Sequence, residues 1–255
     1  MMSENNREEI VVHQRTVFWE YHLTAAVDNL KTIKKIEEFV PEKNIGDEHE
    51  GMSIGRWKTK HDSLVISTLI SSYSTLESAI NSFIDAVCNP IVRNVPRKGF
   101  GLQRLQKEQI IQFEEVYPGD IYEDIKPLDK FNVIIELCDS ECFDKGVEPY
   151  QSMNIIRKMR NHFVHHKPDI IEINDEKPQT KLGSTLMSKG IEPKPEGWEK
   201  GDRPYFPYQC LSSDLTSWSI STTINFINEF FDRIGGETIL KDKTIVKEFE
   251  EIEAD

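Results

Sequence analysis

The feature that most constrains the fold is a run of apolar residues with helical spacing between residues 64 and 87. The run consists of Leu69, Tyr73, Leu76, Ile80, Phe83 and Val87. Spacings of four and three place these side chains on one face of an α-helix. Asp62 or Ser63 is expected to cap this helix and Pro90 to end it. The sequence therefore predicts a long amphipathic helix whose apolar face needs partners.

The same pattern predicts further helices on both sides of the long one. They cover residues 19–40, 102–116, 128–138, 150–166 and 212–234. Residues 42–61 contain three glycines and residues 168–207 contain six prolines, so both stretches are expected to be irregular connections. The prediction is an all-α bundle of about five or six helices with an irregular insertion before the last main helix.

The chain divides into three parts in this prediction. Residues 1–61 form an N-terminal helix and linker, residues 62–235 form the helical domain, and residues 236–255 form an acidic C-terminal tail. The insertion at residues 168–207 is expected to be a mobile surface loop near the end of the helix at 150–166, where it gates access or receives a partner.

A stripe of small side chains runs along a second face of the long helix. It consists of Ser67, Ser71, Ser74, Ser78 and Ser82. Small side chains let another helix axis come close. The stripe is therefore expected to be a packing seam, either inside the domain or between two chains.

The composition is that of a globular protein, with 38% hydrophobic and 29% charged residues. No apolar run reaches the roughly 18 residues that a membrane span needs, and residues 1–9 lack the basic start and apolar centre of a signal peptide. The four cysteines show no paired framework, so we expect small buried residues in a reducing compartment rather than disulfides or zinc ligands. These features predict a cytoplasmic protein without a membrane partner.

The formal net charge of −13 argues against a protein that coats nucleic acid nonspecifically, because phosphate binding needs clustered Lys and Arg. Two stretches without acidic residues differ from this average. The first contains Arg93, Arg97, Lys98, Arg104 and Lys107. The second, residues 149–168, contains four basic residues and three histidines. Such polarity can direct a phosphodiester to two patches, although the first patch could equally be an ordinary solvated face.

The helix predicted at residues 150–166 carries the groups of the second stretch that can do chemistry. At about 100° per residue, Asn161 and His165 lie about 40° apart on one face, whereas Arg160 lies about 140° from His165. For Arg160 and His165 to act on one phosphate, the arginine must curl round the helix or a second copy of the helix must supply the missing group. The helix end favours a protonated His165, which suits a general acid or proton shuttle. Cations near helix ends also occur simply to satisfy backbone carbonyls.

The order Arg160-Asn161-x-x-x-His165 resembles the R-N-x-x-x-H signature of the HEPN superfamily, whose domains are helical bundles. The context is similar too, because a helix with an apolar face and a polar stripe precedes this motif helix and a last helix follows it. The resemblance covers residues 62–235. It implies metal-independent RNA cleavage, in which His165 is the base or acid, Arg160 stabilises negative charge and Asn161 orients a group by hydrogen bonding.

The resemblance also implies partners. Many HEPN proteins are ribonucleases of toxin, abortive-infection or RNA-processing systems, with a site shared by two chains. We therefore expect RNA binding by a homodimer with a composite active site, in a toxin or anti-phage defence effector with a cognate antitoxin or regulatory partner. Arg157, His162 and His166, together with the five basic residues at 93–107, are expected to contact the substrate. Other HEPN domains are noncatalytic modules that bind RNA, nucleotides or proteins, and the motif alone leaves that alternative open.

Two further constellations are weaker. His162, His165 and His166 could ligate a metal ion, but residues 149–168 contain no carboxylate to complete such a site. Neither a metal nor another cofactor is therefore expected. Glu77 and Asn81 lie one turn apart on the long helix, where they either face the motif helix or are ordinary flanking polar residues.

Overall fold

The computed structural model is mostly helical, so the predicted all-α class is confirmed. It describes residues 18–40, 47–88, 124–165, 180–195, 198 and 204–254. The helices in these ranges are α1 (Phe18–Phe39), α2 (Ile54–Cys88), α5 (Pro127–Leu137), α6 (Tyr150–Val164), α7 (Lys181–Ser188), α8 (Ser213–Arg233) and α9 (Thr244–Ala254), with a helical turn η3 (Tyr205–Gln209). A short antiparallel hairpin of β1 (Glu48–His49) and β2 (Met52–Ser53) precedes α2.

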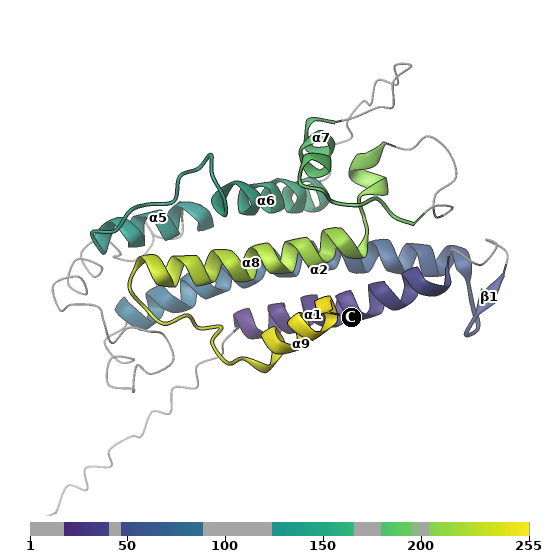
Figure 1. The fold of residues 1–255 in the computed structure, drawn as a ribbon, viewed down its shortest axis with the longest axis horizontal. Helices are drawn as coiled ribbons and strands as arrows, with labels where there is room; N and C mark the ends of the chain where they lie inside the picture. The colour runs from purple at the N-terminus through teal and green to yellow at the C-terminus, as the bar shows by residue number, and fades with distance from the viewer. Residues whose placement is uncertain are drawn as a thin grey trace, which may run out of the picture.

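The central helix of the bundle is α2, which is 35 residues long and packs against α1, α5, α6 and α8. These helices run lengthwise beside one another, and α7 stands across them near one end (Figure 1). All six residues of the predicted apolar face of α2 are buried. Among them, Phe83 meets Phe230 and Phe231 of α8 edge to face, with ring centroids 5.5 and 5.8 Å apart. The predicted face is therefore confirmed.

The start of α2 differs from the prediction, because the helix begins at Ile54 and not at Asp62 or Ser63. The hairpin leads the chain into the helix, and the Ile54 amide donates a hydrogen bond to the Asp47 carbonyl at 3.0 Å. The early turns of α2 are held by a small apolar cluster made of Ile36, Val40, Ile54, Trp57 and Trp198. This long-range burial outweighs the cost of Gly55 in the helix, so the predicted linker is wrong for residues 54–61.

The buried small-residue seam of α2 lies beside the predicted serine stripe rather than on it. Of that stripe, Ser71 alone is buried, and the buried small residues include Thr68, Ser71, Ser72, Thr75 and Ala79. The seam faces α8, where Ser72 Oγ lies 3.3 Å from Ser219 Oγ and Thr223 Oγ1 donates to the Ser72 carbonyl at 3.5 Å. The seam is therefore part of the core of this chain.

Part of the expected irregular insertion is folded. The Thr180 hydroxyl caps α7 by accepting a hydrogen bond from the Gly183 amide at 3.0 Å. The core contacts of this segment are made by Leu186, Ile191, Tyr205 and Phe206. An irregular loop was therefore the wrong prediction for residues 181–188 and for η3. The helix α7 has eight residues, which is too short for its apolar periodicity to identify it.

The segment expected to be an acidic tail contains α9, which packs on α1. Ile245 and Phe249 of α9 are buried in the core. Two lysines of α1 hold the polar side of the helix, with Lys31 Nζ 2.7 Å from Glu248 Oε2 and Lys34 Nζ donating to the Ile252 carbonyl at 2.7 Å. A tail was therefore the wrong prediction for residues 244–254, where apolar residues one turn apart form an amphipathic helix.

The predicted start of α8 is confirmed. Ser212 caps the helix, and its hydroxyl accepts a hydrogen bond from the Leu215 amide at 3.3 Å. After Arg233 the chain leaves the helix through Gly235, whose φ of 67° suits glycine. The predicted last helix is thus correct to within one residue at each end.

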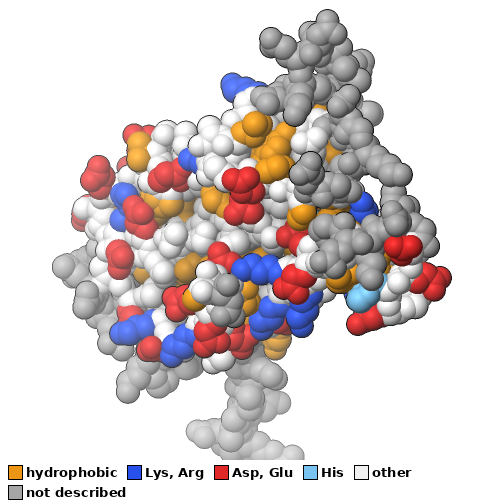
Figure 2. Space-filling view, turned by 45° about the vertical axis from the view of Figure 1, so that its right-hand side comes forward, with side chains coloured by type: hydrophobic (Ala, Val, Ile, Leu, Met, Phe, Trp, Pro, Cys, Tyr) orange, Lys and Arg blue, Asp and Glu red, His pale blue; other side chains and the backbone are white. Residues whose placement is uncertain are grey.

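The described surface carries mixed charge. Acidic and basic side chains are interspersed over the face in Figure 2. In the part of the chain that the structure describes, no helix is long and apolar enough to cross a membrane. The predicted helix at 102–116 and the five basic residues at 93–107 lie outside the described residues.

Candidate functional site

The motif helix α6 is anchored by its apolar face. Met153, Ile156 and Met159 are fully buried, and α6 packs against α2 and α8. The Thr223 hydroxyl of α8 lies 3.9 Å from the sulfur of Met153. With this face fixed in the core, the polar residues near the end of α6 lie toward the surface of the bundle, where they are half-buried or exposed.

Arg160 and Asn161 form the centre of the candidate site. Arg160 is half-buried, and its Nη1 donates a hydrogen bond to Asn161 Oδ1 at 3.1 Å. Asn161 lies about 40° from His165 around the helix, so this bond joins Arg160 to a residue on the face that bears His165. Within the described residues, the buried Arg160 Nε has no hydrogen-bond partner. The guanidinium is therefore partly desolvated, which strengthens its attraction for an anion.

His165 lies directly after the last residue of α6 and is exposed. Its backbone amide donates to the Asn161 carbonyl at 2.9 Å. Asn161 therefore contacts both other members of the motif, Arg160 through its side chain and His165 through its backbone. The predicted place of His165 at the helix end is confirmed, although α6 ends at Val164 rather than at residue 166.

Arg157 is held by its own helix. Its Nε and Nη2 both donate to Asn154 Oδ1, at 3.0 and 2.9 Å. Across the packing interface, burial raises the pKa of Tyr73 in α2 to about 12, and the charge of Glu77 adds to this, while Arg157 and Arg160 oppose it. A neutral phenol therefore lies near both arginines. The apolar spacing of α2 predicted that Tyr73 is buried, but it did not predict that Tyr73 lies near Arg157 and Arg160.

The polar pair Glu77 and Asn81 is divided between two neighbours. Glu77 lies near enough to Tyr73 for its charge to act on the phenol. Asn81 accepts a hydrogen bond from Lys130 of α5 at 3.1 Å. Asn81 thus contacts α5. The helical spacing alone could not show whether Asn81 faces α5 or α6.

His162 faces the turn η3. Its ring is edge to face with Phe206 at 4.9 Å and with Phe163 at 5.5 Å between centroids. Phe206 could not be predicted as a neighbour of His162, because it lies more than 40 residues away in the insertion and has no recognisable pattern around it. His162 therefore lies in an aromatic contact, while His166 and the basic residues at 93–107 lie outside the described residues.

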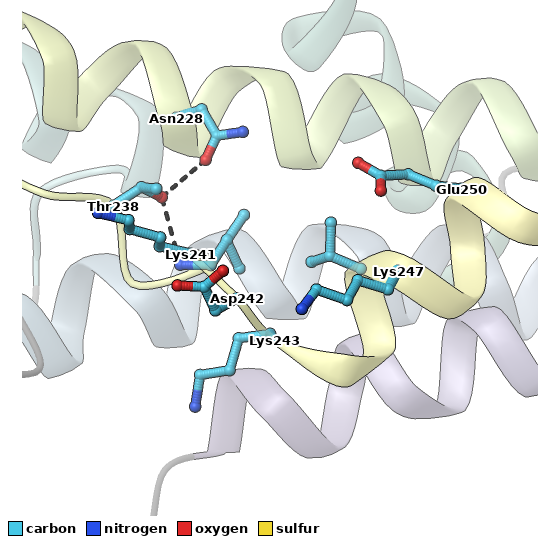
Figure 3. A pocket seen from close by; sticks show the side chains of 9 residues that line it. Asn228, Thr238, Lys241, Asp242, Lys243, Lys247 and Glu250 are labelled. Carbon is cyan, nitrogen blue, oxygen red and sulfur yellow. Dashed lines mark hydrogen bonds between the residues drawn. The ribbon is translucent and has the colours of Figure 1, made fainter.

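A cavity of about 280 Å³ lies elsewhere, between the end of α8 and the start of α9. Its lining consists of Asn228, Thr238, Leu240, Lys241, Asp242, Lys243, Val246, Lys247 and Glu250 (Figure 3). Lys241 pairs with Glu237, and Lys243 Nζ lies 3.3 Å from Glu20 Oε2. The cavity contains none of the motif residues and combines both signs of charge, so we assign it no catalytic role.

The described ranges contain no group of three or more His, Cys, Asp or Glu side chains arranged to hold a metal ion. Cys138, Cys142 and Cys210 are free thiols, of which Cys138 and Cys210 are buried. Comparisons with protein families, with curated proteins and with solved structures find no match for this chain. The chemistry of the site must therefore be argued from its own residues.

Proposed function

We propose that this chain is a metal-independent endoribonuclease of the HEPN type. The observation that carries the proposal is the Arg160 to Asn161 hydrogen bond of 3.1 Å, which joins a cation to the residue that shares a helix face with His165. The helix α6 contains no acidic residue, and a carboxylate there would repel a phosphodiester. A cation, an amide and an exposed imidazole at one helix end match the needs of phosphodiester cleavage.

The proposed reaction is a transesterification within the RNA strand. His165 as a base removes the proton of a ribose 2′-hydroxyl, and the 2′-oxygen then attacks the adjacent phosphorus. The bond from phosphorus to the 5′-oxygen breaks, and the leaving oxygen takes a proton from an imidazolium. Arg160 stabilises the negative charge of the phosphorane, and Asn161 orients Arg160 or a phosphate oxygen. The products are a 2′,3′-cyclic phosphate and a 5′-hydroxyl.

Base and acid are two different groups in this scheme, which favours a homodimer. A two-fold axis beside α6 would bring together two copies of His165, one neutral and one protonated. One His165 ring would then accept the proton of the 2′-hydroxyl while the other donates to the leaving oxygen. We further propose that the enzyme is a toxin or anti-phage defence effector that is restrained by a cognate antitoxin or regulatory partner.

Incubation of the purified protein with mixed RNA in EDTA tests the proposal. We expect cleavage that survives chelation and falls by about 10² to 10⁴ in Arg160→Ala and in His165→Ala. Lys158→Ala is the matched control, because it removes an exposed cation from the same helix outside the motif and should cleave normally. Intact RNA that is bound by the wild type would instead support a noncatalytic binding module.

A further inference from the structure

A buried chain of ionisable groups lies at a distance from the motif, between α1, α2 and the segment that follows α7. The ring of His61, fully buried, has its Nε2 2.8 Å from Glu37 Oε1 and its Nδ1 3.0 Å from Asp62 Oδ1. Asp62 Oδ1 also lies 2.7 Å from the buried Lys194 Nζ. Two carboxylates, one imidazole and one ammonium therefore form a continuous network inside the protein.

The geometry of this network specifies the proton count of His61. A neutral imidazole has one N–H and one bare nitrogen, and the bare nitrogen would face a carboxylate oxygen at hydrogen-bond distance. Both ring nitrogens face carboxylates here, so only the doubly protonated ring satisfies both contacts. With His61 and Lys194 positive and Glu37 and Asp62 negative, the four charges of the network balance, which offsets the cost of burying His61 and Lys194.

The network holds the segment that covers the motif helix. The ring of Trp198 lies over His61 with centroids 4.5 Å apart. The Lys194 amide donates to the Gln209 carbonyl of η3 at 2.8 Å. In the same turn, Phe206 contacts the ring of His162 near the end of α6. A continuous line of contacts therefore joins the buried His61 to the helix that bears the motif.

We propose that Glu37, His61, Asp62 and Lys194 form a proton-dependent clamp that fixes residues 191–195, 198 and 204–209 near the end of the motif helix. The clamp is closed when His61 carries two protons. Loss of one proton leaves Glu37 and the partly exposed Asp62 against a single ammonium and weakens the hold on Lys194 and Trp198. His61 is thus a positioning residue, whose effect on RNA cleavage rests on the proposed function, whereas the clamp itself does not.

The charged and titratable neighbours of His61 come from every element packed around it. Glu37 belongs to α1 and also accepts hydrogen bonds from the Ser213 amide and hydroxyl at the start of α8. Asp62 and Lys58 belong to α2, and Lys58 Nζ lies 5.6 Å from the centre of the Trp198 ring. Lys194 follows α7, and the nearby Cys210 thiol stays protonated because burial raises its pKa to about 12. Histidine is the side chain whose ordinary pKa lies nearest neutral pH, so His61 is the group to vary in a test of the network.

The direction of the pH dependence follows from these contacts. Burial alone lowers the pKa of His61, but the hydrogen bonds to Asp62 and Glu37 and their charges outweigh it and raise the pKa above its ordinary 6.5. The clamp is therefore fully closed below pH 6.5 and loosens as the pH rises through the raised pKa. With one proton released on opening, the opening constant grows by at most about tenfold per pH unit in this window.

Hydrogen exchange of the full-length protein from pH 6 to 9, corrected for intrinsic exchange rates, tests the clamp. In the wild type, protection of residues 204–211 should step down above pH 6.5, while the core of α1 keeps its protection. His61→Gln should show low protection of residues 204–211 without the step. Lys194→Met should move the step to higher pH, because His61 then faces two carboxylates alone.

Tyr205→Phe is the matched control. It removes the hydrogen bond from the Tyr205 hydroxyl to the Ile191 carbonyl at 2.6 Å, which ties the same segment without titrating in this range. Protection should fall by a constant factor of roughly ten at most, with the step unchanged. A wild type without the step, or a step that persists in His61→Gln, would overturn the clamp.

RNA cleavage measured over the same pH range separates the clamp from the proposed function. If the protein cleaves RNA, cleavage by the wild type should follow the step and cleavage by His61→Gln should not. If no RNA is cleaved at any pH, the proposed function fails, and hydrogen exchange still decides whether the clamp exists.

Discussion

The seam between α2 and α8 allows a sharp test of how the bundle is packed. Ser72 is fully buried there, with its hydroxyl 3.3 Å from that of Ser219. Ser72→Leu forces a larger side chain into a contact that only small residues allow. The control is Ser67→Leu, which makes the same change on an exposed position of the same helix.

The expected cost of Ser72→Leu combines two effects. Overpacking of a close contact costs about 1–3 kcal/mol. Loss of the hydroxyl contact adds about 1 kcal/mol or less, because Ser219 still donates to the Thr216 carbonyl at 2.8 Å. The free energy of unfolding should therefore fall by about 1–4 kcal/mol, with roughly 2–4 °C lost in Tm for each kcal/mol.

Urea denaturation followed by far-UV circular dichroism measures the difference between the two variants. Ser67→Leu should stay within about 0.5 kcal/mol of the wild type. Ser72→Ala should cost about 1 kcal/mol or less, because it keeps the close approach and loses only the hydroxyl. Equal stability of Ser72→Leu and Ser67→Leu would refute a close seam at this position.

Two further predictions concern the motif helix and its charges. Burial raises the pKa of Glu148, but hydrogen bonds from Lys189 and Ser152 outweigh it and hold the pKa below its ordinary 4.5. The stabilisation by Glu148 is present above pH 4.5 and is lost as the pH falls through the lowered pKa. Urea unfolding of the wild type from pH 6 to 3 should show this loss, and Glu148→Gln should not. The two proteins should differ in free energy of unfolding by less than about 1 kcal/mol, because the Glu148 side chain is half-exposed. Mixing Arg160→Ala with His165→Ala places the Arg160 of one chain beside the single remaining His165 of the other, so partial RNA cleavage should return if a shared site works with one imidazole; no recovery would exclude that arrangement.

Periodic patterns predicted the parts of the fold that bury one helical face over many turns. The apolar repeat of α2 identified its buried side, and Ser212 identified the start of α8, because both are local signals. The start of α2 at Ile54 could not be predicted, since the contact that stabilises it comes from Trp198. The serine stripe failed for a related reason: serine is small on any face, and only the position of α8 decides which small residues are buried.

In the candidate site, too, local features could be predicted from the sequence and contacts between distant segments could not. The sequence predicted that Arg160, Asn161 and His165 lie near the end of one helix and that Asn161 and His165 share a face, because both follow from chain order and helix geometry. The hydrogen bond between the Arg160 and Asn161 side chains depends on side-chain torsions, which the spacing of residues does not fix. The contact of His162 with Phe206 and the network around His61 join segments far apart in the chain, so neither had a local signal.

The chemistry of the RNA ends tests the central claim most directly. The wild type is incubated in EDTA with a short RNA, and with the same RNA carrying a 2′-deoxyribose at the cleaved position. We predict a 2′,3′-cyclic phosphate and a 5′-hydroxyl from the RNA, no cleavage at the deoxy position, and cleavage lowered by about 10² to 10⁴ in Arg160→Ala and in His165→Ala. Products with a 3′-hydroxyl and a 5′-phosphate, cleavage of the deoxy substrate, or RNA left intact by the wild type would contradict it.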